Sequence, residues 1–553
     1  MMRHLPTTCG IALLMLAAAA AWAQSPEPLV SGITIRSITT FDAGSIRVVR
    51  DPLTGGLLVA LMDGRLYSVP SPFHDTTKTL VGTAADHGLT GVQGMAIAPD
   101  GTLYLSANHQ EGNYNIAIIA RGSRVGDSGF RWDTLARTEP YPFGNQGFDH
   151  TCNGLAVSGD GQFVFMNSGS RTDHGEVQDN GGIFPGMRDV PITSAILRIP
   201  ASSRNLVIPN NDSALRATGI LFAKGTRNSF DLEFAPNGDL IGTENSGDHD
   251  DNEELNWIRE GGHYGFPWRL GTTDMPQQFP GYNPENDHLL NKNSLGYTRG
   301  TFHNDSTFPA RPAGVTFTDP IPNAGPDAVT FRDPGDGSLH TATPAERMGT
   351  FTAHRSPLGL VFDSAGALPS DFNADAFMLS WTEGTPAAND LLTPFNDPGQ
   401  DMLQLQMRKN GQSYTLASRR IIRGFAQPID AAIVRDRIYV LEWGGAHNLW
   451  EVDFSKAGEV RASRGSEYTV SPPYPNPAAG ETRMSIGVQR TQHVRVELRT
   501  MLGARAALLY EGSVEAAAPA WITLDCTSLP SGVYMIVAHG ERFTASQRLE
   551  VIR

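Results

Sequence analysis

The sequence has little cysteine and little basic charge. Of its 553 residues three are cysteine, and 43 Lys and Arg face 58 Asp and Glu, which gives a net charge of −15 at pH 7. A nucleic-acid-binding protein would normally present a basic face, so this balance argues against that class. Cys152 and Cys526 lie far apart and are expected in different domains, which argues against a disulfide between them.

Long apolar segments are also missing after the N-terminus. Arg3 and His4 precede an apolar run from Ile11 to Ala21, and a small-x-small cleavage site follows at residues 21–23. This run is too short for a permanent membrane-spanning helix, and no other segment qualifies. We therefore predict a signal peptide at residues 1–23 and a secreted or cell-surface protein after periplasmic export, not an integral membrane protein.

Long amphipathic helical patterns are absent, whereas glycine (58) and proline (37) are abundant. Such a turn-rich chain of short apolar runs is expected to be all-β, and 553 residues are too many for one ordinary core. No nucleophile elbow, Walker loop, Rossmann fingerprint or zinc-ligand spacing occurs in context.

A strand–turn–strand pattern repeats along the chain. Its clearest copies are Gly94 to Leu105, Gly154 to Phe165 and Asp231 to Ile241, with weaker copies at residues 48–61, 359–380 and 430–441. Pro, Asp and Gly at the turns fix φ, cap the turn and accept a positive φ, respectively. Six copies predict a six-bladed β-propeller over residues 35–454, with a pair of β-sandwiches as the alternative.

The character of the chain changes after residue 454. Residues 455–477 are polar and end in a proline-rich run, which predicts an extended linker. Alternating strands in residues 478–553 predict a small β-sandwich. The Tyr-Pro-Asn-Pro opening at residues 474–477, the strand from Leu529 to Val537 and the basic last strand resemble the C-terminal sorting domain of type IX secretion. This resemblance implies passage through the type IX machinery to the cell surface; an immunoglobulin-like binding module is the alternative.

The segment from Gly225 to Pro267 concentrates polar side chains. It contains Arg227 and Asn228, then a loop from Glu244 to Glu254 with six acids and no Lys or Arg, then a glycine-rich turn. Repulsion among these acids must be relieved by cations, water or neighbouring donors. The segment therefore predicts a site for a hard cation beside an anionic ligand.

Residues 35–454 resemble the glucose/sorbosone dehydrogenase family, which includes the soluble quinoprotein sugar dehydrogenases. The resemblance rests on Asp149 to Leu155 and on the Arg-Asn, Glu-Asn-Ser-Gly and Gly-Gly-x-Tyr-Gly-Phe-Pro elements between Gly225 and Pro267. Weaker matches lie at Ser356 to Leu360 and Gly424 to Asp430. Family members are six-bladed propellers, which agrees with the repeat.

The resemblance implies that His150 is the general base of sugar oxidation and that hydride passes to pyrroloquinoline quinone (PQQ). A histidine suits proton transfer because its ordinary pKa is about 6.5. Asp149 could orient the imidazole, but neighbours on a strand point to opposite sides, so a loop or bulge is needed there. The alternative is a loop histidine with a structural hydrogen bond.

The resemblance also implies that Arg227, Asn228 and Asn245 contact the quinone, since a guanidinium suits carboxylates and an amide suits carbonyls. Arg227 could instead neutralise the acidic loop. The family's further basic residues are missing near Ser380 to Gly384 and near Phe425 to Pro428. Arg355 and Arg423 are the nearest substitutes.

Calcium is expected beside the quinone through the backbone carbonyls of Ser246 and Gly247. Asp250, Asp251 and Glu254 either hold a separate structural cation or are solvated. The spacing of the acids resembles an EF-hand, but Glu253 stands at the position of the turn glycine and Arg259 at that of the bidentate acid.

The leading hypothesis is a secreted PQQ- and calcium-dependent oxidoreductase that acts on an aldose or a related sugar and passes electrons to an external acceptor. Two alternatives stay open. One is a propeller that binds glycans or envelope partners without redox chemistry, and the other is a calcium-dependent lactonase-like hydrolase.

Overall fold

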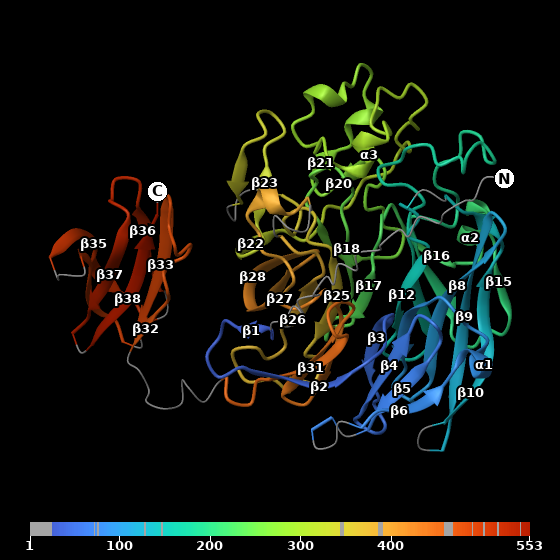
Figure 1. The fold of residues 1–553 in the computed structure, drawn as a ribbon, viewed down its shortest axis with the longest axis horizontal. Helices are drawn as coiled ribbons and strands as arrows, with labels where there is room; N and C mark the ends of the chain where they lie inside the picture. Colours follow the sequence, from blue (N-terminus) through green and yellow to red (C-terminus); the bar gives the residue numbers. More distant parts are fainter. Residues whose placement is uncertain are drawn as a thin grey trace, which may run out of the picture. The chain divides into compact units, whose positions relative to one another are not determined.

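The computed structural model describes residues 25–70, 72–73, 77–126, 129–144, 147–342, 348–384, 391–457, 468–488, 490–500, 504–516, 519–541 and 543–552. The predicted signal peptide and residues 458–467 of the predicted linker lie outside these ranges. The chain divides into two compact units, Met1–Gly458 and Glu459–Arg553 (Figure 1).

Strands dominate the described residues, so the prediction of an all-β chain is confirmed. The α-helices among them are short: α1 (Ala84–His87), α2 (Asp212–Ala217) and α3 (Leu295–Thr298). No helix in the described part of the chain is long and apolar enough to span a bilayer.

The described residues of the first unit form six larger sheets, each with antiparallel neighbours along its first three strands. The first two sheets contain β3 (Ser45–Arg50), β4 (Leu57–Leu61), β5 (Leu66–Val69) and β6 (Thr79–Gly82), and then β7 (Val92–Ile97), β8 (Leu103–Glu111), β9 (Tyr114–Val125), β10 (Gly129–Thr138), β11 (Tyr141–Pro142) and β15 (Leu206–Ile208). The third and fourth contain β12 (Cys152–Val157), β13 (Phe163–Ser168), β14 (Ala195–Pro200) and β16 (Leu221–Lys224), and then β17 (Asp231–Phe234), β18 (Leu240–Glu244) and β19 (Glu254–Ile258).

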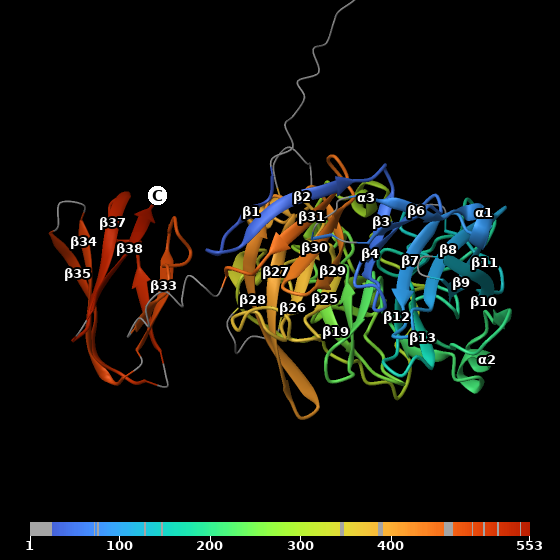
Figure 2. The ribbon, with the colours of Figure 1, turned by 90° about the horizontal axis from the view of Figure 1, so that it is seen from below.

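The last two sheets recruit strands from the N-terminal segment. The fifth contains β25 (Pro357–Phe362), β26 (Ala376–Ser380), β27 (Asp401–Asn410), β28 (Ser413–Arg423), β1 (Glu27–Pro28) and β22 (Asn323–Pro326). The sixth contains β29 (Pro428–Val434), β30 (Arg437–Glu442), β31 (Asn448–Asp453) and β2 (Thr34–Thr40). Figure 2 shows β1 and β2 beside the late strands β28 and β31, with which they pair.

The first strands of these sheets touch one another in a closed ring, in the order β3, β7, β12, β17, β25, β29 and back to β3. This is the arrangement of a β-propeller. Each sheet buries both faces against its neighbours, which is why the strands read as nearly continuous apolar runs such as β4 and β26.

The repeated turns have the expected chemistry. Gly101, Gly161 and Gly238 all have φ between 69° and 84°, which a side chain would strain. The Asp100 carboxylate accepts from Thr102 N at 2.9 Å, and Asn237 Oδ1 accepts in the same way from Asp239 N at 3.1 Å. Each predicted copy falls on the first two strands of one sheet.

A buried arginine connects several of the sheets. Arg47 of β3 is 2 % exposed and donates to Gln93 O (2.8 Å), to Phe230 O (2.6 Å) and to the Asp231 carboxylate (3.2 Å). The second Asp231 oxygen accepts from Leu360 N at 2.8 Å. These contacts join the first, second, fourth and fifth sheets.

Antiparallel pairing places the start of each first strand beside the end of its second strand. The segments just before β12, β17, β25 and β29 and those just after β13, β18, β26 and β30 therefore open at one end of the ring. The predicted site residues lie mainly in these segments.

A long insertion between β19 and β25 supplies short elements near that end (Figure 1). They are β20 (Arg269–Leu270), β21 (Thr273–Asp274), η1 (Pro276–Gln278), η2 (Pro284–Asn286), α3, β22, β23 (Thr330–Arg332) and β24 (Leu339–Thr341). A further short helix, η4 (Thr393–Phe395), lies between β26 and β27.

The second unit contains two sheets whose inward side chains share one hydrophobic core. Their strands are β32 (Tyr468–Val470), β33 (Glu481–Val488) and β36 (Ala520–Asp525), and then β35 (Arg505–Val514), β34 (Gln492–Thr500), β37 (Gly532–His539) and β38 (Thr544–Val551). β32 lies within the predicted linker but pairs with β33, so this stretch is part of the second unit. Cys152 and Cys526 are both free and buried.

Candidate functional site

His150 lies in the segment that leads into β12 of the third sheet. Its Nδ1 is 3.3 Å from Ser170 O and its backbone N donates to the same carbonyl at 2.9 Å. Burial and the nearby Arg227 charge lower the pKa of His150 to about 3. The imidazole is therefore neutral at physiological pH. With Nδ1–H toward Ser170 O, Nε2 carries the lone pair that can accept a proton.

Asp149 does not orient that imidazole. Its carboxylate accepts from Gly144 N at 2.7 Å and Thr151 N at 3.3 Å, and it lies 4.0 Å from Arg171 Nε. Burial raises the pKa of Asp149 to about 6. The backbone is irregular here, as contact between Asp149 and His150 would have required, because Thr151 has φ 54° and the register shifts between Cys152 and Leu155. It turns the carboxylate toward its own loop, and the Ser170 carbonyl makes the orienting contact.

Arg227 and His150 are joined through Ser170, whose N donates to Arg227 O at 2.7 Å. The Arg227 guanidinium is buried and already bonded. It donates to Asp173 O and Asp173 Oδ1, both at 2.8 Å, and to Asn245 O at 3.2 Å. The carboxylate that neutralises it therefore comes from the third sheet's loop, not from the acidic loop of the fourth.

Four amides form a buried network beside this arginine. Asn228 Nδ2 donates to Asn245 Oδ1 at 2.7 Å, and Asn228 Oδ1 accepts from Asn153 Nδ2 at 2.8 Å. Asn167 Nδ2 donates to Asn153 Oδ1 at 2.7 Å. The structure thus brings His150, Arg227, Asn228 and Asn245 together at the open end of the ring.

Sequence reasoning missed the ionic cluster behind Arg227. Asp173 Oδ2 lies 2.9 Å from His174 Nδ1, and Glu176 accepts from both Asp173 N and His174 N at 2.9 Å. Burial alone would lower the pKa of His174, but the Glu176 and Asp173 carboxylates raise it. Its ring stacks on Phe302 at 3.7 Å. The run Asp173-His174-Gly175-Glu176 could have indicated an ionic cluster in the sequence. Such a run of acids and histidine does not by itself show that Asp173 pairs with Arg227.

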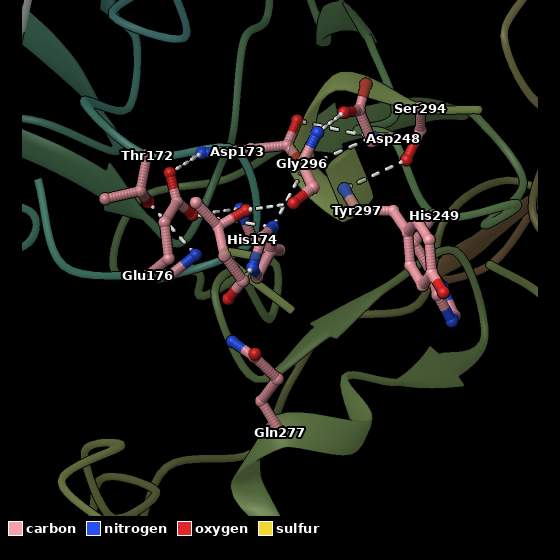
Figure 3. Close-up of polar contacts among 12 residues, drawn as sticks. Thr172, Asp173, His174, Glu176, Asp248, His249, Gln277, Ser294, Gly296 and Tyr297 are labelled. Atoms are coloured by element: carbon pink, nitrogen blue, oxygen red, sulfur yellow. Dashed lines mark hydrogen bonds and ion pairs between the residues drawn. The ribbon is translucent and has the colours of Figure 1, made fainter. Parts of the chain in front are cut away.

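Figure 3 shows how the acidic loop meets this cluster. Asp248 N lies 3.2 Å from both oxygens of Asp173, and Asp248 Oδ2 accepts from Gly296 N at 2.5 Å. The insertion that contains Gly296 therefore covers the cluster. Gly247 is equally confined, because a Cβ there would lie 2.8 Å from Asp173 Oδ1.

The three acids predicted to bind a metal each contact different partners and do not form one site. Asp250 accepts from Arg332 Nε at 2.7 Å and pairs with His354 Nε2 at 2.8 Å. Asp251 lies 2.9 Å from His249 Nδ1. Glu254 accepts from Gly271 N and Asn256 Nδ2, both at 2.7 Å. These neighbouring donors relieve the repulsion, and no group of three or more His, Cys, Asp or Glu in the described residues could hold a metal ion.

The carbonyl oxygens of Ser246 and Gly247 remain open, since no described residue donates to either. Ser246 N and Oγ both lie 3.3 Å from Glu253 Oε1, which also accepts from Ser356 N at 3.0 Å. Glu253 Oε2 is buried without a partner, and burial raises the pKa of this carboxyl to about 7. The sequence considered Glu253 only as a departure from the EF-hand pattern and did not predict this role.

Arg355 and Arg423 lie outside this group. Arg355 is fully buried and bonds to Asp397, to Asp401 Oδ1 at 2.5 Å and to Ser380 Oγ at 2.7 Å. Arg423 is exposed at the end of β28 and pairs with Glu27 at 2.6 Å. Neither guanidinium extends the charge of Arg227.

A cavity of about 400 Å³ opens at the same end, between the fifth and sixth sheets. Its lining is Trp381, Thr382, Glu383, Gln400, Ala426, Gln427, Gly444 and Gly445. It adjoins the Asn245 and Glu253 group through Ser356, whose Oγ accepts from Thr382 Oγ1 at 3.0 Å. Gly444 and Gly445, in the turn after β30, form one wall.

Comparison with known proteins finds a similarity over the first four sheets. The family model for glucose/sorbosone dehydrogenase matches residues 45–283, which include His150, Arg227, Asn228, Asn245 and the acidic loop. The cavity lies beyond the matched residues. No curated protein matches the chain.

Several solved structures are also similar. The soluble aldose sugar dehydrogenase of Escherichia coli, in its apo form, is 15% identical, with 76% of this chain and 99% of that chain covered and a TM-score of 0.47. The PQQ-bound aldose sugar dehydrogenase of Streptomyces coelicolor is 15% identical, with 77% and 99% covered and a TM-score of 0.43. The holo PQQ domain of the Coprinopsis cinerea pyranose dehydrogenase is 11% identical, with 78% and 98% covered and a TM-score of 0.48.

The described residues do not fit PQQ in the way the resemblance implies. The quinone carries three carboxyl groups, which call for several cationic partners. Arg227 is already paired with Asp173, Arg355 is paired with two aspartates, and Arg423 pairs with Glu27. Two of the predicted calcium ligands, the Ser246 and Gly247 carbonyl oxygens, accept no hydrogen bond from the described residues and fit a calcium ion. The other three, Asp250, Asp251 and Glu254, are bonded to protein groups.

Proposed function

We propose that the protein is an exported sugar oxidoreductase in which His150 accepts the proton of the reacting hydroxyl. One observation carries the proposal: the residues matched by the glucose/sorbosone dehydrogenase model include His150, Arg227 and Asn228, and these side chains lie together at the open end of the ring. The proposed architecture is a six-bladed propeller followed by a β-sandwich.

The chemistry follows from the state of His150. Oxidation of a sugar hydroxyl to a carbonyl removes a proton from oxygen and a hydride from carbon. The neutral imidazole, held by Ser170 O, can take that proton at Nε2. Arg227 and the amides of Asn228 and Asn245 supply donors beside it, which can position a polar ligand and stabilise developing negative charge.

PQQ is the two-electron acceptor that the family match favours, and it would supply hydride acceptance when bound. The resemblance assigns its contacts to Arg227, Asn228 and Asn245, of which Arg227 already pairs with Asp173. Calcium is proposed only at the Ser246 and Gly247 carbonyls, because it accepts backbone oxygens readily. The chain's own cationic groups do not match the quinone, so its binding is what the first experiment measures.

The decisive experiment is reconstitution of the full secreted chain with calcium and PQQ. Quinone absorbance after desalting reports binding, and dye reduction with a panel of aldoses reports turnover. We expect His150→Asn to abolish reduction while quinone absorbance is retained, and exposed His109→Asn to behave like the parent protein. Absence of both absorbance and reduction in the parent would refute the dehydrogenase proposal.

A second candidate is a glycan-binding protein without redox chemistry. It is favoured by the cavity between the fifth and sixth sheets, which no described Lys or Arg lines. Sugar binding in a protein that reduces no dye and retains no quinone would support this candidate.

We also propose export by the signal peptide at residues 1–23 and sorting by residues 478–553 through type IX secretion. The N-terminal run and the Tyr-Pro-Asn-Pro segment support this proposal. In a host with that machinery, removal of residues 478–553 should leave the protein in the periplasm. Unchanged surface delivery of the truncated chain would count against the sorting role.

A further inference from the structure

A small pocket lies beside β16, the outermost strand of the third sheet. Its lining comes from α2, from β16, from the glycine-rich turn after β19 and from the insertion that follows, and its polar side chains are those of Arg216, Lys224 and His263. We call it the Lys224 pocket. Its volume is about 80 Å³. Since a water molecule takes about 30 Å³ in the liquid, the pocket has room for an ion of a few atoms.

Lys224 has no acid as a partner. Its Nζ donates to Pro191 O at 2.6 Å and to Thr193 O at 3.0 Å, and no carboxylate bonds to it in the part of the chain that the structure describes. An ammonium group has three N–H donors, so one is left for a ligand. Arg227, three positions further on, is neutralised by Asp173. A buried cation without such a counter-charge is costly, and a bound anion would relieve that cost.

Positive charge dominates the Lys224 pocket. Burial lowers the pKa of Lys224 to about 8; the Arg216 charge adds to the decrease, and the Asp212 and Asp189 charges oppose it. Burial, together with the charges of Lys224 and Arg216, lowers the pKa of His263 to about 4. The nearest of these acids, Asp212, accepts from Arg216 Nε at 2.7 Å, and no acid lines the pocket. The pocket therefore disfavours added protons and favours an anion.

The imidazole of His263 is held with a donor free. Gly265 N donates to its Nδ1 at 3.2 Å, so the proton of the neutral ring lies on Nε2, from which no described residue accepts. The ring stacks on Phe317 with the centroids 5.0 Å apart. Glycine is needed at position 225, because a Cβ there would collide with this ring. All three polar side chains of the pocket are thus donors, which suits a ligand made of acceptors.

We propose that the Lys224 pocket binds a small oxyanion, of the phosphate or sulfate kind, between Lys224, His263 and Arg216. A tetrahedral oxyanion presents acceptors in several directions, which matches donors that come from three separate segments. The inference goes beyond the proposed function, since it requires neither a sugar nor a quinone.

The test is isothermal titration of the full chain with phosphate and with sulfate, at an ionic strength kept constant with chloride. We expect at least one of the two to bind, and Lys224→Met to weaken this binding by about tenfold or more, because a charge-assisted hydrogen bond is lost. Lys456→Met is the matched control, since this exposed lysine lies in the same unit outside the pocket and its loss should leave binding unchanged.

Arg216→Gln is the second variant. Its side chain is 60% exposed, so folding should be retained and the loss of affinity should be smaller, about threefold. Circular dichroism identifies a variant that fails to fold, and Arg216→Gln alone then decides if Lys224→Met does. Sulfate keeps its charge between pH 7 and pH 9.5, whereas Lys224 loses its proton over this range, so the parent protein should bind sulfate at least about threefold more weakly at pH 9.5.

The inference is overturned if neither oxyanion binds against the chloride background, if a folded pocket variant binds like the parent protein, or if Lys456→Met loses as much affinity as Lys224→Met. A sulfate affinity that is the same at pH 7 and pH 9.5 would also count against Lys224 as the central contact. Because neither PQQ nor a sugar is present, the outcome is independent of the reconstitution experiment.

Discussion

Substitution of Arg355 by methionine should destabilise the propeller unit strongly, whereas the same substitution at Arg423 should not. Both arginines were predicted to bind a cofactor, but only Arg355 is fully buried, where it shares Asp397 and Asp401 with Arg420. Methionine keeps most of the volume and leaves two buried carboxylates facing one guanidinium. Removal of one partner from such a buried cluster costs about 3–5 kcal/mol.

The Arg423 pair gives the opposite expectation. Its side chain is 55% exposed and that of Glu27 is 56% exposed, so solvent screens the interaction. Loss of an exposed pair costs about 0–1 kcal/mol. The two variants thus differ by several kcal/mol although the substitution is the same.

Urea unfolding followed by tryptophan fluorescence measures the difference. Arg355→Met should unfold at markedly lower urea with an unchanged slope, and addition of Asp397→Asn should recover part of the loss by removing one unpaired charge. Equal, small losses for Arg355→Met and Arg423→Met would refute a structural role for Arg355. Weaker quinone binding without loss of stability would restore it as a cofactor contact.

Three further predictions follow from the site. Because the pKa of His150 is about 3, dye reduction should not fall between pH 8 and pH 5 through protonation of this residue; a decline centred near pH 6.5 in the parent protein, with quinone absorbance unchanged over that range, would contradict the buried environment. The Asp251 and Asp287 carboxylates raise the pKa of buried His249 against the effect of burial, so its stabilisation is complete below its unfolded pKa of about 6.5 and is lost as pH rises through the folded pKa. His249→Gln should therefore destabilise more at pH 6 than at pH 9 in thermal unfolding, and the reverse order would be inconsistent with the ion pairs. Gly247→Ala should cost about 1–3 kcal/mol, because its Cβ would lie 2.8 Å from Asp173 Oδ1, whereas Gly159→Ala, with nothing within 4 Å, should be tolerated; equal stabilities would contradict the close packing.

Local chemistry made the repeated hairpins predictable. A turn such as residues 98–102 depends on neighbours two to four positions apart, which the sequence displays directly. The irregularity at Thr151 was only a condition for contact between Asp149 and His150, because adjacent strand residues face opposite sides. Asp149 then turned the other way, since its partner Gly144 N lies on its own loop.

The fate of the acidic loop was not predictable, because its partners are remote. Asp250 meets Arg332 and His354, which are 82 and 104 positions away. Its neighbour Asp251 meets His249. A dense acidic run looks the same in sequence whether it collects a cation or distributes its charges among separate partners.

By itself, the sequence determined an all-β chain with repeated hairpins, little basic charge and a concentration of His150, Arg227 and Asn228 in segments that lead into strands. Tertiary structure alone decided that Asp173 neutralises Arg227, that Arg355 is an internal ion-pair partner, and that a cavity without basic residues opens beside them. The physical reason is the sequence distance over which each interaction acts. Turn and strand preferences act over a few residues, whereas burial and charge pairing depend on which distant segments the closed ring brings together.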